Sequence, residues 1–172
     1  MVKDLTEKVQ SSMSKFEELT SRIPGYAGYK RKEQRREADK LLRLYVARQY
    51  EGQLSRLNEV EEMLASQGDL KAILPLERAV MKLQLLIDRI KTASYGYAGL
   101  LDAIKVDEEV LDKLYAFDQA MLDGVEQVSG LLDQLTEASQ GKEGTSVAAG
   151  ELVVALSGLN STFSRRQDVI LD

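Results

Sequence analysis

The 172-residue chain contains no histidine and no cysteine. Histidine is the side chain whose ordinary pKa lies nearest neutral pH, and cysteine supplies the usual thiolate nucleophile and soft metal ligand. Their absence excludes Ser-His-Asp and Cys-His relays, the common zinc sites and disulfides. Glycine loops that cradle phosphates are absent as well. We therefore expect no catalytic residue, no cofactor and no metal site.

An enzyme built on carboxylates is the one catalytic alternative that this composition leaves. Adjacent acids occur as Glu17-Glu18, Glu61-Glu62 and Glu108-Glu109. Neighbouring residues on a helix diverge by about 100°, so these pairs do not converge on one substrate or metal. The sequence therefore predicts a protein that is not an enzyme.

Proline and long apolar runs are also scarce. Only Pro24 and Pro75 occur, and the most apolar stretch, residues 147–156, is interrupted by Glu151 and is too short to span a bilayer. The first residues are already charged and contain no apolar signal core. We expect a cytoplasmic protein with no transmembrane segment. The net charge of −5 argues against non-specific binding of nucleic acid by the molecule as a whole.

What the chain does have is helical periodicity. Apolar residues recur three or four positions apart in five segments, 4–22, 29–67, 69–93, 107–138 and 147–171. Gly68 and Asp69 suit the end of one helix and the cap of the next. Gly52 lies within a helical segment, where it indicates a kink or a close approach of another helix. The sequence thus predicts an all-α fold, an up-and-down bundle of four to five long antiparallel helices.

Two regions of this bundle can be described further. We expect residues 1–140 to form the bundle domain, and residues 141–172 to form a linker and a C-terminal helix packed on the same bundle. Segment 69–93 carries a second apolar face with Met81, Leu85 and Leu86, which predicts that it is the most buried helix. Arg165-Arg166 interrupts the last apolar face, which predicts an exposed final turn.

One tetrapeptide, Gly-Tyr-Ala-Gly, occurs twice, at 25–28 and at 96–99. The plainest interpretation is a pair of helix-breaking turns. In an up-and-down bundle, however, the first and third helices end at the same pole. This topology would gather four tyrosines at one end of the molecule, namely Tyr26, Tyr29, Tyr95 and Tyr97.

A basic segment begins at the same predicted pole. From Arg22 to Arg48 nine Lys or Arg residues stand against three acids, whereas residues 102–143 carry eleven acids and three Lys. Cations in the first turn of a helix oppose its macrodipole. Either the acidic start of segment 107–138 neutralises the basic start of segment 29–67, or the pole is an anion site.

The function predicted from these features is a non-enzymatic, cytoplasmic helical bundle that acts as a scaffold or adaptor for another protein, or that self-associates. Rigid aromatic contacts and steering cations are typical of such surfaces. The alternative is peripheral binding of anionic lipid or nucleic acid through the basic segment 30–48. The predicted binding residues, which we call the predicted pole, are Tyr26, Tyr29, Lys30, Arg31, Lys32, Arg35, Arg36, Tyr95 and Tyr97.

Overall fold

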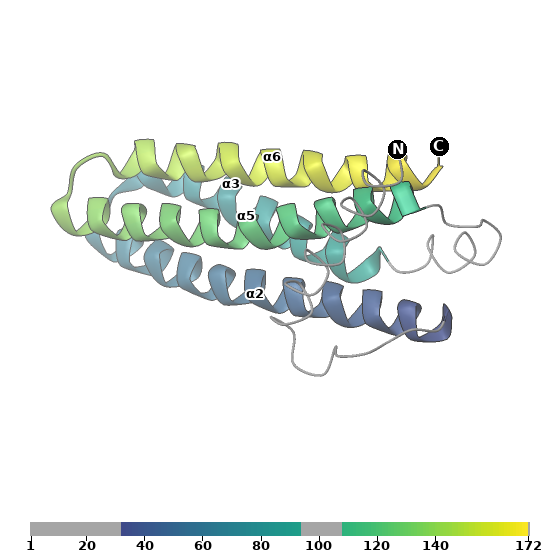
Figure 1. Cartoon of the computed structure of the whole chain (residues 1–172). Coiled ribbons are helices and arrows are strands. Elements are labelled where there is room, and N and C mark those ends of the chain that lie inside the picture. Colours follow the sequence, from purple (N-terminus) through teal and green to yellow (C-terminus); the bar gives the residue numbers. More distant parts are fainter. Residues whose placement is uncertain (1–31, 94–107, 172) are drawn as a thin grey trace.

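The computed structural model describes residues 32–93 and 108–171, and the side chains of residues 41–93 and 116–166. Within these ranges the chain forms four helices and no strand, so the all-α prediction is confirmed there (Figure 1). They are α2 (Lys32–Gln67), α3 (Leu70–Thr92), α5 (Glu108–Gly141) and α6 (Thr145–Leu171). The predicted helix over 4–22 lies outside the described residues.

The turn between α2 and α3 forms as the local sequence predicts. Gly68 has a positive φ of 74°, a conformation in which a side chain would be strained. The Asp69 side chain accepts a hydrogen bond from the backbone N–H of Ala72 at 3.4 Å, which caps α3. Pro75 is the sixth residue of α3 and lies inside the helix, so the carbonyl of Lys71 lacks its usual N–H partner from position 75. Two residues therefore suffice to reverse the chain.

The connection between α5 and α6 is short. The linker expected at the start of residues 141–172 is a tight turn, because α5 continues to Gly141 and α6 begins at Thr145. Lys142 and Gly144 both have positive φ angles, 58° and 73°, so three residues reverse the chain. The buried Thr145 hydroxyl donates to the Ala138 carbonyl at 3.4 Å and ties the two helix ends together.

Each helix packs on two others. The main contacts are α2 with α3 and α5, and α6 with α3 and α5, so α3 and α5 lie on a diagonal. Tyr50 and Arg56 of α2 reach Met121 and Ser129 of α5, so these two neighbouring helices are parallel, which differs from the antiparallel neighbours that the sequence predicted. Figure 1 shows that α2 and α5 begin at the end where α3 and α6 finish.

The core lies along the shared axis and is almost entirely aliphatic. The apolar stripes expected on α2 and α5 are buried there, as with Leu57 and Leu132. Close helix approach occurs at Gly124 of α5, where an added Cβ would meet the Leu159 side chain and lie 2.5 Å from the Tyr50 hydroxyl. At Gly52 a Cβ would meet nothing within 4 Å, so the prediction of a close approach there is wrong.

Candidate interaction surface

Most of the predicted pole lies outside the described residues. Lys32, Arg35 and Arg36 belong to the first turns of α2, although their side chains are not among those described. The other six residues of the predicted pole, and both Gly-Tyr-Ala-Gly copies, fall in 1–31 or 94–107. The structure therefore leaves this set of binding residues as a prediction.

The helix ends that border the predicted pole do lie together. In Figure 1 the first turns of α2 and α5 occupy the same end of the bundle as the last turn of α3. Arg43 near the start of α2 donates to the carbonyl of Ile90 near the end of α3, at 3.5 Å. This placement is the one that the sequence argument required of these three helix ends.

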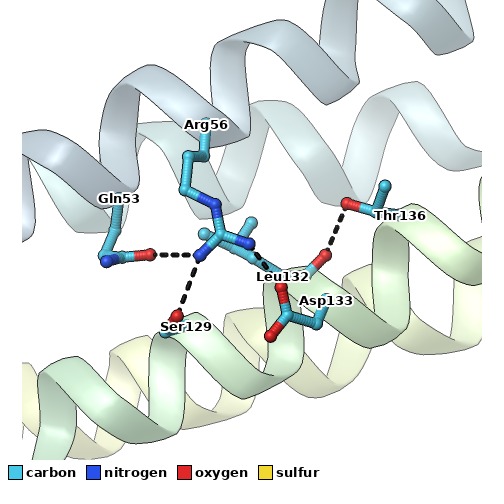
Figure 2. A network of polar contacts seen from close by, with 6 residues as sticks. All are labelled: Gln53, Arg56, Ser129, Leu132, Asp133 and Thr136. Carbon is cyan, nitrogen blue, oxygen red and sulfur yellow. Dashed lines mark hydrogen bonds and ion pairs between the residues drawn. The ribbon is translucent and has the colours of Figure 1, made fainter.

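Polar contacts fix the register of α2 against α5 (Figure 2). Arg56 of α2 donates to Ser129 Oγ at 2.9 Å and pairs with Asp133 at 2.5 Å, while Gln53 accepts from the same guanidinium at 2.9 Å. Hydrogen-bonded partners on the two helices are separated by 71, 73 and 77 positions along the chain. The two helices are therefore aligned along their length.

This register bears on the two explanations of the basic segment. Separations of 71 and 73 in the contacts nearest this end place the first turns of α2, which carry Arg35 and Arg36, level with the acidic start of α5. Arg43, which the sequence counted among the available cations, is buried beneath the surface. The register thus brings the two helix starts together, as internal neutralisation requires, and burial of Arg43 leaves one cation fewer at the surface.

A buried ion pair lies inside the same end of the bundle. Arg166 of α6 reaches Asp118 of α5 through Nε at 3.0 Å and Nη2 at 2.9 Å. Arg166 is 1% exposed, so the prediction that Arg165-Arg166 marks an exposed turn is wrong for this residue. Arg165 does point to solvent. A charged residue that interrupts an apolar helix face can therefore be buried when the neighbouring helix carries an opposite charge, as Asp118 does for Arg166.

A second buried polar group stands deeper in the bundle. The Tyr50 hydroxyl donates to the Met121 carbonyl at 2.7 Å and fits over Gly124. Burial raises the pKa of the Tyr50 phenol above its ordinary value of 10.0, because the phenolate would lose its hydration. The described interior thus uses its polar groups to join helices to one another.

The largest departure from the sequence analysis is on α3. Four large apolar side chains point to solvent: Leu70 is 78% exposed, Leu74 63%, Met81 61% and Leu85 51%. Successive helix residues turn by 100°, so these four fall within an arc of about 60° that lies opposite the buried side of α3. The prediction that α3 is the most buried helix is therefore wrong. We call these four residues the outer stripe of α3.

Contacts on both sides of α3 hold this stripe outward. Arg89 donates to Asn160 and Ser164 of α6, with its guanidinium 5.4 Å from the centre of the Phe163 ring. The Asn160 side chain in turn donates to the Lys82 carbonyl at 3.0 Å. On the α2 side Lys91 pairs with Glu51. Rotating α3 to bury the stripe would break all of these contacts.

No cluster of three or more potential metal ligands occurs among the described residues, and no helix described there is long and apolar enough to cross a bilayer. Comparison with protein-family models, with curated proteins and with solved structures found no match for the chain. The outer stripe of α3 is thus the described surface feature that bears on function. Met81 and Leu85 were recognised from their spacing as part of a second apolar face, but that face was expected to be buried, and Leu70 and Leu74 were not assigned to it.

Proposed function

We propose that this protein is a non-enzymatic scaffold or adaptor whose recognition surface is the outer stripe of α3, and that the stripe receives an amphipathic helix of a partner protein. The observation that carries the proposal is the set of four large apolar side chains held away from the core. Leu70 to Leu85 spans about 22 Å along one helix, a length and width that suit a second helix rather than a flat surface.

For the whole chain, the proposal keeps the up-and-down bundle of four to five helices and its place in the cytoplasm. The predicted pole is then a second contact region, in which tyrosines supply apolar area and the remaining cations supply steering. The register of α2 against α5 supports a protein partner over anionic lipid or nucleic acid, because it sets part of the basic start beside acids.

The test uses a photo-crosslinking amino acid at Met81 in the full chain, expressed in cells. We expect covalent capture of a partner segment whose mapped peptide has apolar residues at helical spacing, and loss of that capture in Leu74→Gln. The matched control carries the crosslinker at Val154 of α6, a position that is 72% exposed. Equal capture of the same protein from Val154, or none from Met81, would refute the proposal.

A further inference from the structure

Two opposite charges flank the middle of the outer stripe of α3. Leu70 and Leu85 mark the ends of the stripe, so its middle falls between Glu77 and Arg78. At 100° per residue, Glu77 lies about 20° beyond one edge of the apolar arc and Arg78 about 20° beyond the other. Both side chains are exposed. The stripe therefore has an acid on one flank and a base on the opposite flank, at nearly the same level.

Neither of these charges joins α3 to the other described helices. Two further charged residues of α3 do so, since Arg89 donates to α6 and Lys91 pairs with Glu51 of α2. No ion pair or side-chain hydrogen bond links Glu77 or Arg78 to another residue of the described ranges. Both charges are therefore available to a molecule that covers the stripe.

A second α3 helix matches these charges in one orientation only. When two identical helices lie side by side in parallel, opposite flanks meet, so Glu77 of each helix faces Arg78 of the other. When they lie antiparallel with the whole stripe covered, like flanks meet, so Glu77 faces Glu77 and Arg78 faces Arg78. Like charges at such a distance oppose association. The two charges therefore select the parallel pair.

We propose that the partner of the outer stripe is a second copy of this chain, and that the two α3 helices lie parallel and in register, with Glu77 of each copy beside Arg78 of the other. Leu74 and Met81 then lie near the two-fold axis, each against its own equivalent. This assignment rests on the proposed function, because it names the occupant of the same surface. Four apolar side chains and their flanks fall short of the about 800 Å² per partner that a standard interface buries, so the dimer dissociates on dilution.

Single cysteines test the orientation in a chain that otherwise has none. Leu74→Cys and Met81→Cys each place one thiol near the axis, and Val154→Cys on α6, at a position that is 72% exposed, is the matched control. Under mild oxidation of the purified full chain, the two stripe variants should form disulfide-linked homodimers about tenfold faster than the control, because equivalent Cα atoms lie within bonding range. A mixture of the two should yield few mixed dimers, since positions 74 and 81 are displaced by about 10 Å along the axis.

Neutral variants test the charges by sedimentation equilibrium over a range of concentrations. Glu77→Gln and Arg78→Gln each remove both ion pairs of the dimer, so each should raise the dissociation constant about 2- to 10-fold. In an antiparallel dimer the same variants would lower it, because they remove a contact between like charges. Both positions are exposed, so circular dichroism should show unchanged helix content.

Three results would overturn the parallel dimer. Mixed dimers that form faster than homodimers would show an antiparallel pair. Stripe cysteines that oxidise no faster than Val154→Cys would show that the two α3 helices do not meet. A chain that sediments as a monomer at every concentration would exclude a second copy as the partner.

The crosslinker at Met81 separates this inference from the proposed function. Capture of α3 from a second copy, seen as a covalent species of twice the mass of the chain, supports both. Capture of a helix from a different protein would mean that the second copy is wrong and the proposed function stands. Capture of another segment of the same copy, or of nothing by a chain that is monomeric, would contradict both.

Discussion

Arg166 and Asp118 form an ion pair inside the bundle, 48 positions apart in the chain, with both side chains almost completely removed from solvent. Two contacts from one guanidinium converge on a single carboxylate oxygen, Oδ1. Desolvation of both charges makes such a pair a poor source of net stability, whereas loss of one partner leaves a buried charge. The pair therefore fixes the position of α6 against α5 more than it strengthens the fold.

Removing one member of this pair should be severe. We expect Asp118→Leu or Arg166→Leu alone to lower the free energy of unfolding by about 3–5 kcal/mol, measured by chemical denaturation. The double variant should recover most of that loss, because both members of the buried pair are removed together. Arg165→Leu on the adjacent exposed position is the control and should stay within about 0.5 kcal/mol of the parent. A double variant as unstable as either single one would contradict the assignment.

Tyr50 should make stability depend on alkaline pH. The folded phenol has a raised pKa, so above pH 10 the unfolded chain releases a proton that the folded chain keeps. Stability then falls as pH rises, by up to about 1.4 kcal/mol per pH unit for one group. In Tyr50→Phe this contribution should vanish.

The measurement is the slope of unfolding free energy against pH between 9 and 11 in the two proteins. Other tyrosines and lysines contribute equally to both, so the difference between slopes reports Tyr50. Below pH 9 the variant should be less stable by about 1 kcal/mol through loss of the hydrogen bond to Met121. Parallel slopes would show that the phenol is not buried as described.

Two glycines of α5 should respond in opposite ways to alanine. Gly124→Ala places a methyl group against Leu159 and the Tyr50 hydroxyl, and we expect a loss of about 1–3 kcal/mol through overpacking. Gly130→Ala meets nothing within 4 Å on the same helix and should gain about 0.5–1 kcal/mol. Thermal unfolding of the two variants gives the comparison directly, and equal effects would contradict the close approach at Gly124.

The basic start of α2 gives the fourth prediction. If acids of α5 neutralise it, replacing Arg35 and Arg36 with Gln should lower stability by about 0.2–1 kcal/mol per pair, with the loss shrinking as salt screens the parent. Arg48→Gln, exposed on the same helix, should change little. The opposite result would favour the anion site. In that case the Arg35→Gln, Arg36→Gln variant would be at least as stable as the parent and would no longer bind vesicles of anionic phospholipid.

The sequence predicted the helices better than it predicted their outward faces. The apolar stripe of α2 from Leu42 to Leu64 is buried, as its spacing predicted, because one face of this helix is apolar and the other is charged. On α3 both faces carry large apolar residues, and periodicity alone does not tell which face is buried. Polar contacts decide it, since Arg89, Asn160 and Lys91 fix the rotation of the helix.

Long-range pairing explains the remaining differences. Gly52 and Gly124 look alike in sequence, and only the approach of α6 and Tyr50 distinguishes them. Arg166 resembled a surface residue because its partner Asp118 lies on another helix. The predicted pole stays a prediction: the described ends of α2, α3 and α5 lie together, and the side chains of the pole lie outside those that the structure describes.

Because α2 is parallel to α5 and α3 is parallel to α6, the end of the bundle where α2 and α5 begin has two halves with opposite partial charge. The amino ends of α2 and α5 lie side by side there, and so do the carboxyl ends of α3 and α6. Their dipoles reinforce within each pair, so one half of that end attracts negative groups and the other half positive ones. Arg89 and Lys91 sit in the last turn of α3, in the half that attracts cations. This end of the bundle is therefore polarised across its width, with each partial charge confined to the outermost turns of its helices.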